Sequence, residues 1–242
     1  MSVVLITGGG KRIGRELALS FAVKGWDVLI HYNNSFDDAQ KTKREIIDKG
    51  RYAEIYQADL KEYAQILNMF DKIAFNKVIP DVLINNAAIF PSRTTIENIS
   101  IKQWEEVLKV NLSSPFLMSK EFAKIVTKQA RIINISSLGG INIWKDRIDY
   151  NVSKSALIQL TKVLARALAP QISVNVVCPG YIDLSEHKSK NENKEKMSLQ
   201  KIPMNRYGTV EDVFEAVYFF SSCSQFITGQ VLIVDGGQSL IH

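Results

Sequence analysis

The sequence predicts an α/β fold in which a doubly wound parallel sheet is covered by helices on both faces. Short apolar runs rich in Val and Ile alternate along the chain with segments whose apolar residues recur at helical spacing. These runs are nearly continuous, as in strands that are buried on both sides. A glycine-rich turn follows the first run. Such alternation builds right-handed βαβ units, and the strands are therefore expected to lie parallel in one sheet.

The order of elements follows from these runs. Strands are predicted at residues 3–7, 27–32, 52–58, 81–86, 130–136, 172–178 and 230–235. Helices are predicted between them at residues 15–24, 37–49, 62–75, 101–128, 150–169 and 209–222. No linker, repeat or shift in composition interrupts the chain, so residues 1–242 are expected to form one domain. The polar stretch 185–201 predicts a solvated loop, a lid over a substrate pocket, or both.

Composition narrows the class of protein. Hydrophobic residues make up 46% and charged residues 23%, as in an ordinary globular protein. The net charge of +5 suits an anionic small ligand, but the basic residues are scattered, which argues against nucleic acid. No apolar stretch is long enough to span a bilayer and no signal segment is evident, so we expect no membrane association and a cytoplasmic location. Cys178 and Cys223 lie in apolar runs and are expected to be reduced, buried thiols.

The turn "TGGGKRIG" (residues 7–14) joins the first strand to the first helix. Glycines there permit a sharp turn and let a pyrophosphate approach the N-terminus of the helix. The turn is therefore predicted to bind a dinucleotide. The contacting residues are expected to be Gly8, Lys11, Arg12, Ile13 and Gly14.

The end of the second strand, "HYNNS" (residues 31–35), indicates which dinucleotide is bound. An NAD-binding fold commonly places a carboxylate here to hold the ribose diol, and that carboxylate would repel a 2′-phosphate. No acidic residue occurs before Asp37. The basic pair in the glycine turn and the donors Asn33, Asn34 and Ser35 therefore favour NADP(H).

The segment "YNVSK" places Tyr150 and Lys154 on one face of a helix. A phenol is a poor base at neutral pH, because its pKa is about 10. We expect the nearby ammonium, together with an oxidised nicotinamide, to bring that pKa toward the working range. Ser137, at the end of a predicted strand, can hold a carbonyl oxygen. No cluster of His, Cys and carboxylates has metal-ligand spacing, so no metal site is expected, and the dispersed histidines, including His31, have no evident acid–base partner.

Over essentially its whole length the chain resembles the short-chain dehydrogenase/reductases. The matching segments are "TGGGKRIG" (7–14), "ADL" (58–60), "NNAA" (85–88), "KVNLSSPF" (109–116), "NISS" (134–137), "YNVSK" (150–154), "NVVCPG" (175–180), "RYGTVEDV" (206–213) and "TGQVLIVDGG" (228–237). The resemblance implies a Rossmann-like fold with a seven-stranded parallel sheet. It also implies a homotetramer or homodimer that associates through the helices of Asn111 and Tyr150 and the C-terminal strand.

The same resemblance implies roles for single residues. Asn111 would kink its helix and hold a water in a proton relay, Ser137 would bind the reacting oxygen, and Tyr150 would be the general acid in reduction. Lys154 would bind the nicotinamide ribose and lower the pKa of the tyrosine. Further cofactor contacts are implied at Asp59 and Leu60 (adenine), Asn85 and Ala87 (ribose), and Pro179, Gly180 and Ile182 (nicotinamide).

The activity implied is NADPH-dependent reduction of a carbonyl, a ketone or 3-oxoacyl group, to a secondary alcohol. A complete Asn-Ser-Tyr-Lys set argues against a redox sensor without turnover. The alternative is a pteridine reductase. Most members of the family have a glycine at the position of Arg12, but pteridine reductases have Arg there, as this chain does. Pteridine reductases also have an aromatic residue at the position of Phe90, and it stacks on the pterin. They differ in having Asp at the position of Ser137.

Other details bear on the substrate. The segment "QKIPMNRYGTVEDV" is similar to 3-oxoacyl-carrier-protein reductases, but the basic residue that those enzymes use for carrier docking is not evident in residues 166–171. Leu184 replaces a Thr that many members place near the cofactor amide. Phe90 and Trp144 are expected to face the substrate, with a wall or surface role as the simpler alternative for each.

Overall fold

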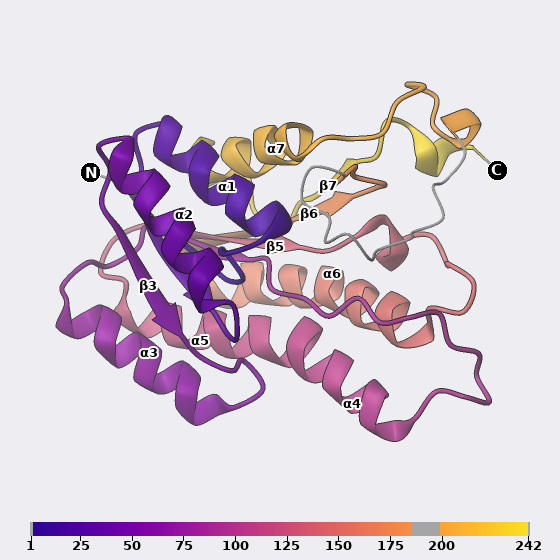
Figure 1. The fold of residues 1–242 in the computed structure, drawn as a ribbon, viewed down its shortest axis with the longest axis horizontal. Coiled ribbons are helices and arrows are strands. Elements are labelled where there is room, and N and C mark those ends of the chain that lie inside the picture. The colour runs from indigo at the N-terminus through magenta and orange to yellow at the C-terminus, as the bar shows by residue number, and fades with distance from the viewer. Residues whose placement is uncertain (1, 185–198, 242) are drawn as a thin grey trace.

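The computed structural model describes residues 2–184 and 199–241. It contains one parallel sheet of seven strands, as predicted, and the strands lie in the order β3-β2-β1-β4-β5-β6-β7 (Figure 1). The strands are β1 (Val3–Ile6), β2 (Asp27–Tyr32), β3 (Ala53–Gln57), β4 (Val82–Asn85), β5 (Ala130–Ile135), β6 (Ile172–Pro179) and β7 (Val231–Val234). Residues 185–198, where the loop or lid is predicted, lie outside the described residues.

Helices cover both faces of the sheet. One face carries α1, α2 and α7, and the other carries α3, α4, α5 and α6 (Figure 1). The helices are α1 (Arg12–Val23), α2 (Phe36–Asp48), α3 (Tyr63–Phe75), α4 (Ile101–Leu108), α5 (Ser114–Ile125), α6 (Ile148–Leu168) and α7 (Val210–Ser222). In the described part of the chain, no helix is both long and apolar enough to cross a membrane.

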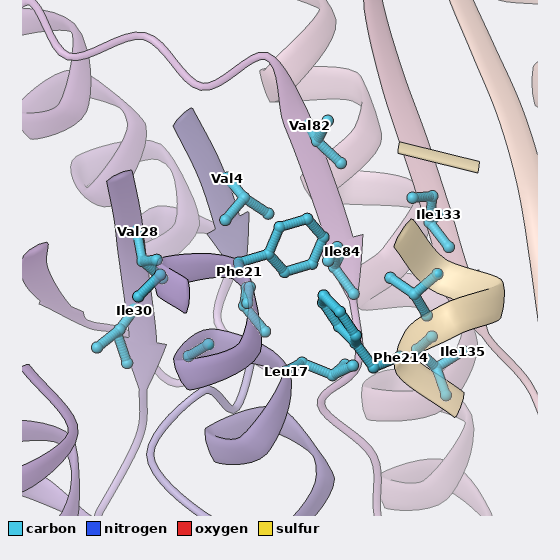
Figure 2. Close-up of a cluster of buried hydrophobic side chains, with 14 of the residues drawn as sticks. Val4, Leu17, Phe21, Val28, Ile30, Val82, Ile84, Ile133, Ile135 and Phe214 are labelled. Carbon is cyan, nitrogen blue, oxygen red and sulfur yellow. The ribbon is translucent and has the colours of Figure 1, made fainter. Parts of the chain in front are cut away.

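Each face of the sheet has its own hydrophobic core. Along β1 the side chains alternate, so that Val4 and Ile6 join the cluster under α1 and α7 while Leu5 joins the cluster on the opposite face. Phe21 of α1 lies fully buried at the centre of the first cluster, edge-on to Phe214 of α7 at 5.3 Å between ring centroids (Figure 2). Burying one such side chain contributes about 2–3 kcal/mol. Packing in the two cores therefore holds in place the carboxyl ends of the strands, which together form one edge of the sheet.

Two predicted helices differ from the structure, one by an interruption and the other in its first residue. The segment 101–128 is divided into α4 and α5 by a π-helical turn at Lys109–Ser113. Pro115 has no N–H to donate to the carbonyl of Asn111, so regular α-helical bonding cannot continue through this point. The first helix begins at Arg12 rather than Arg15, which places the end of the glycine turn in the first turn of α1.

The cysteines only partly match the expectation. Both thiols are free, and Cys178 is buried in β6, but Cys223 is only half-buried at the C-cap of α7. The apolar run around Cys223 ends with the helix, so the side chain there lies at the margin of the core.

Candidate active site

The predicted site residues gather at the carboxyl edge of the sheet. β1 is paired with β2 on one side and β4 on the other, so the strand order reverses at β1. Ligands of doubly wound sheets bind outside such a reversal, beyond the carboxyl ends of the strands. The loops that follow β1, β4, β5 and β6 carry the glycine turn, Ala87, Ser137 and Gly180, respectively.

The glycine turn is held closely against the loop after β4. The Thr7 hydroxyl accepts hydrogen bonds from the backbone N–H groups of Asn86 and Ala87, each at 2.9 Å. Gly8 has φ +65°, and a Cβ at Gly14 would lie 2.2 Å from the Gly8 carbonyl oxygen, so glycine is required at both positions. The turn therefore brings the backbone of two loops together at the N-terminus of α1.

The N-terminus of α1 fits a phosphate. No side chain caps it, and its first turn contains no acidic residue. Helix N–H groups at such an end lack intrahelical partners and attract anions. The absence of a Cβ at Gly14 lets the turn pack closely on the start of the helix, so the donor set here suits the pyrophosphate of a dinucleotide.

His31, for which the sequence indicated no acid–base partner, links this turn to the end of β3. Its Nδ1 accepts a hydrogen bond from the Gly8 N–H at 3.1 Å, and Nε2 lies 2.9 Å from the carbonyl oxygen of Ala58. A carbonyl only accepts, so Nε2 carries the proton and the ring is neutral. Burial lowers the pKa of His31 to about 4, which maintains this state. No sequence pattern identified this residue, because both contacts are distant in the chain.

The residues expected around a 2′-phosphate lie on one side of the glycine turn. Arg12 is exposed and has φ +50°, the left-handed conformation of the glycine it replaces. Lys11 forms an ion pair with Asp38 of α2 at 2.9 Å. The predicted donors Asn33, Asn34 and Ser35 precede α2, and Ser35 makes no side-chain cap there. Asp38 is a carboxylate that the sequence analysis did not place near this site.

The residues expected beside the adenine and ribose take different positions. Leu60 is buried, and the Asp59 backbone N–H donates to Gln65 at 2.7 Å. Asn85 lies inside the sheet, where its amide donates to Asn134 at 2.9 Å. The Asn85 Oδ1 is buried and has no protein partner. Ala87 is half-buried next to the glycine turn, so of the two ribose residues it is the more accessible.

Tyr150 and Ser137 meet at the carboxyl end of β5. Both are buried, and the Ser137 hydroxyl is close enough to the phenol to favour its ionised form. Burial nevertheless dominates and raises the pKa of Tyr150 above its usual value. The effects that oppose burial come from Ser137 and then Arg147. The phenol is thus held protonated, as a general acid must be. The expectation that Lys154 lowers the pKa of Tyr150 stays a prediction.

Lys154 lies one helical turn after Tyr150, with Nζ 5.8 Å from the centroid of the phenol ring. Its ammonium donates to the carbonyl of Ile135 at 2.8 Å. Because the side chain is fully buried, desolvation lowers the pKa of Lys154 to about 8. The residue is therefore poised to exchange a proton near neutral pH.

Asn111 lies in the π-helical turn, where its helix departs from regular α-helical bonding. Its side-chain amide clamps the backbone of Ile89, accepting from the N–H at 2.8 Å and donating to the carbonyl at 2.9 Å. Nδ2 also donates to Ser153 at 3.1 Å, and Ser153 in turn donates to the carbonyl of Tyr150. Asn111 thus joins the Tyr150 helix to the loop that carries Phe90.

Phe90 and Trp144 border the phenol of Tyr150. The Phe90 ring is edge-on to Tyr150 with 4.7 Å between centroids, and Trp144 is stacked on Tyr150 at 6.0 Å with 15° between the planes. Phe90 remains 45% exposed, so it lies at the surface rather than in the core. Phe90 and Trp144 flank the phenol, and the three rings together are called the aromatic slot.

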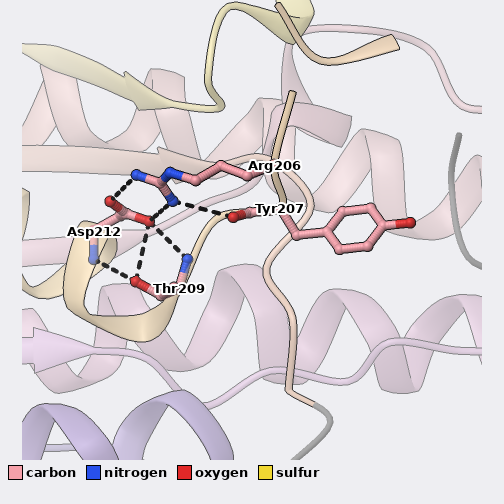
Figure 3. Close-up of polar contacts among 4 residues, drawn as sticks. All are labelled: Arg206, Tyr207, Thr209 and Asp212. Atoms are coloured by element: carbon pink, nitrogen blue, oxygen red, sulfur yellow. Dashed lines mark hydrogen bonds and ion pairs between the residues drawn. The ribbon is translucent and has the colours of Figure 1, made fainter. Parts of the chain in front are cut away.

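The residues expected beside the nicotinamide are anchored to β7 and to the segment that precedes α7. The Gly180 N–H donates to Val234 at 2.9 Å, and Ile182 pairs with Gly208 after Pro179 has ended β6. Gly208 is followed by a capping box at the start of α7. There Thr209 and Asp212 bond reciprocally, and Arg206 forms an ion pair with Asp212 at 2.7 Å (Figure 3). This motif was recognised in the sequence only as part of a resemblance.

The family model described as Enoyl-(Acyl carrier protein) reductase matches residues 9–239. The 3-oxoacyl-(acyl-carrier-protein) reductase FabG of Buchnera aphidicola subsp. Schizaphis graminum is 38% identical over 96% of this chain and 95% of its own length. The "Uncharacterized oxidoreductase YgfF" of Escherichia coli is 32% identical over 98% of this chain and all of its own length.

Solved structures agree with this assignment. A short chain dehydrogenase from Burkholderia cenocepacia in complex with NADP has a TM-score of 0.90 and 30% identity, and covers 98% of each chain. A blue fluorescent protein from a metagenomic library in complex with NADPH has a TM-score of 0.89 and 30% identity, with the same coverage. Sequence, fold and the arrangement of Ser137, Tyr150 and Lys154 lead to one conclusion. The chain belongs to the short-chain dehydrogenase/reductase family of oxidoreductases.

Proposed function

We propose that this protein is an NADPH-dependent reductase that converts a carbonyl, a ketone or 3-oxoacyl group, to a secondary alcohol. The observation that carries the proposal is the buried phenol of Tyr150 beside the Ser137 hydroxyl, at the edge of the sheet that also holds the glycine turn. The names of the relatives, which are 3-oxoacyl-(acyl-carrier-protein) reductases, support a carbonyl substrate.

The cofactor proposal rests on the donors of this chain. The uncapped N-terminus of α1 would hold the pyrophosphate, and Arg12 with Asn33, Asn34 and Ser35 would hold the 2′-phosphate. Lys11 would contribute once its ion pair with Asp38 opens. NADPH, when bound, supplies the hydride. The two neighbours solved with NADP or NADPH support this choice.

Ser137 and Tyr150 would act together on the carbonyl oxygen. Ser137 Oγ accepts a hydrogen bond from the Gly139 N–H at 3.1 Å, which leaves its own O–H to donate to the substrate. Tyr150 would donate a second hydrogen bond and then its proton as the oxygen gains negative charge. The buried ammonium of Lys154 would stabilise the phenolate that remains and help to return the proton. Asn111 would keep the Tyr150 helix in place.

The test is NADPH oxidation by the purified protein with acetoacetyl thioester, ethyl acetoacetate and a dihydropterin as separate substrates. Tyr150→Phe should lower kcat with the accepted carbonyl by about 10²–10⁴-fold, the usual contribution of a general acid. Tyr56→Phe, which removes another buried phenol remote from the site, should leave kcat unchanged. Unchanged turnover in Tyr150→Phe would refute the proposed mechanism.

A pteridine reductase is the second candidate, and Phe90 is the observation that favours it. Its ring is partly exposed beside Tyr150, where it could stack a planar substrate. Ser137 opposes this candidate, because a carboxyl is the family's usual residue there in pteridine reductases. Turnover of the dihydropterin alone would reverse the ranking of the two activities.

We also propose that the protein is a homotetramer or homodimer. Apolar side chains are exposed along the helices of the site and on the outer strand β7. They are Phe116 of α5, Val152 and Val163 of α6, and Val231 and Ile233 of β7. Exposed apolar surfaces of this kind commonly mark interfaces. Light scattering after gel filtration tests the proposal, and a monomeric mass at micromolar concentration would contradict it.

A further inference from the structure

Arg147 holds a cation at the edge of the aromatic slot. The guanidinium carbon lies 4.2 Å from the centroid of the Phe90 ring, within cation–π distance, and Nη1 donates to the carbonyl of Pro91. The loop that carries Phe90 and the loop that carries Arg147 are joined to each other. The Thr94 N–H donates to the backbone carbonyl of Asp146 at 3.0 Å, and Thr94 pairs with Arg147. The position of this charge is therefore fixed by backbone structure.

The charge is not neutralised by an ion pair within the described residues. Asp149, two residues after Arg147, has both oxygens engaged, with Oδ1 accepting from the Tyr150 N–H and Oδ2 from Gln103, each at 2.7 Å. A second cation is close, since burial and then the charge of Arg93 lower the pKa of Arg147. Two arginines held near one another favour an anion beside them.

Arg147 and Tyr150 both contact the ring of Phe90. The Phe90 ring contacts the guanidinium at 4.2 Å and the phenol at 4.7 Å, both measured from ring centroids. The guanidinium is also near enough to Tyr150 to favour the phenolate. A molecule that places its carbonyl at the phenol can therefore reach the guanidinium with a group a few bonds away.

We propose that Arg147 binds a carboxylate of the substrate, so that the preferred substrates are oxo-acids rather than neutral ketones. This inference rests on the proposed function and narrows its substrate class. A guanidinium suits a carboxylate, because its parallel N–H groups match the two oxygens. Among the described residues, the Pro91 carbonyl is the only hydrogen-bond acceptor of Arg147, and the other N–H groups remain for the substrate.

The experiment compares acids with their esters. Acetoacetate, levulinate and 5-oxohexanoate place one, two and three methylenes between ketone and carboxylate, and their ethyl esters present the same ketone without charge. Wild type should show a higher kcat/KM for at least one acid than for its ester. Arg147→Gln should reduce that acid-to-ester ratio by about 10- to 100-fold, the value of a hydrogen bond to a charged group. The ratio cancels any general loss of activity.

Two variants complete the design. Arg147→Lys keeps the charge but not the paired donors, and should keep part of the preference for the acid. Lys145→Gln removes the same charge from an exposed neighbour in the same loop, and should leave the ratio at its wild-type value. Equal or better turnover of every ester by wild type would overturn the inference while the proposed reductase activity stands. Failure to reduce any of the acids, esters or thioester would overturn both.

Discussion

The imidazole of His31 accepts a hydrogen bond from the backbone N–H of Gly8, across 3.1 Å, and so ties the second strand to the first glycine of the phosphate-binding turn. Its other nitrogen is bonded to Ala58 at the end of β3. The ring thus connects β2 to two loops at the carboxyl edge, and the loop after β3 carries the expected adenine residues Asp59 and Leu60. The buried, neutral imidazole of His31 therefore positions the glycine turn, which is expected to bind the negatively charged pyrophosphate.

Replacing His31 with Phe should weaken cofactor binding rather than chemistry. The change preserves an aromatic ring but leaves the Gly8 N–H and the Ala58 carbonyl without a partner, at a cost of about 1–3 kcal/mol for each buried group. We expect a lower Tm and a KM for NADPH raised about 10-fold, with kcat changed less than threefold. Steady-state kinetics and thermal unfolding measure both.

Tyr56→Phe is the matched control for this variant. Tyr56 is also buried on the neighbouring strand β3, and its hydroxyl accepts a hydrogen bond from Asn76. The control should lower Tm without raising the KM for NADPH. If His31→Phe behaved in the same way, the ring would be structural and not a positioning residue for the turn.

The sequence predicted the elements whose cause is local or periodic. Continuous apolar runs such as that around Leu5 mark doubly buried strands, and βαβ alternation then fixes parallel order. Because parallel strands end at one edge, Ser137 after β5 and Tyr150 near the start of α6 lie at the same edge of the sheet. That their side chains act together was implied by the family resemblance and not by topology.

Contacts that depend on how loops fold back were not predictable. Lys11 was expected to be available for phosphate, but α2 packs so closely on the turn that a Cβ at Gly10 would lie 3.2 Å from the Ala39 nitrogen. This packing brings Asp38 to Lys11. Likewise, Arg147 reaches Phe90 through a bridge between two irregular loops. Neither relation has a periodic or spacing signal in the sequence.

Removing the carboxylate of Asp38 should strengthen the binding of NADPH. Asp38→Asn frees Lys11 and removes a negative charge from the expected 2′-phosphate site, and exposed charge pairs of this kind are worth about 0.2–1 kcal/mol. We expect the KM for NADPH to fall about twofold to fivefold and the KM for NADH to change less. Asp37→Asn, one residue earlier in α2 and also exposed, is the control. Equal effects of the two variants would show that only net charge matters.

Arg12→Gly should raise the free energy of unfolding and weaken the preference for NADPH over NADH. Arg12 has φ +50°, and a side chain in this conformation costs about 1 kcal/mol, so glycine should raise the free energy of unfolding by up to that amount. The same change removes a guanidinium, and the KM for NADPH should rise about 10-fold relative to that for NADH. Lys77→Gly, at φ +57° in the turn after α3, should give the stability effect alone. An unchanged preference for NADPH would remove Arg12 from the phosphate site.

Lys154→Met should make the protein more stable and less active. Burial lowers the pKa of Lys154 from 10.5 to about 8. At pH 7 the folded protein therefore holds a buried ammonium group that has lost its hydration, and this loss reduces the free energy of unfolding. Between pH 8 and 10.5 the unfolded chain binds more protons than the folded one, and the wild type should gain up to about 3 kcal/mol of stability as pH rises through this window. At pH 7 Lys154→Met avoids that penalty but loses the bond to Ile135, worth about 1 kcal/mol, for a net gain of about 2 kcal/mol.

Denaturant unfolding of wild type and Lys154→Met at pH 7, 8, 9 and 10 measures this difference, which should shrink steadily as pH rises. Carbonyl reduction by the variant should fall about 10²-fold or more, since the phenolate of Tyr150 loses its neighbouring cation. Lys162→Met, an exposed lysine on the same helix, should change neither activity nor the slope of stability against pH. A variant less stable than wild type by the same amount at every pH would mean that Lys154 is retained for packing and not for proton transfer.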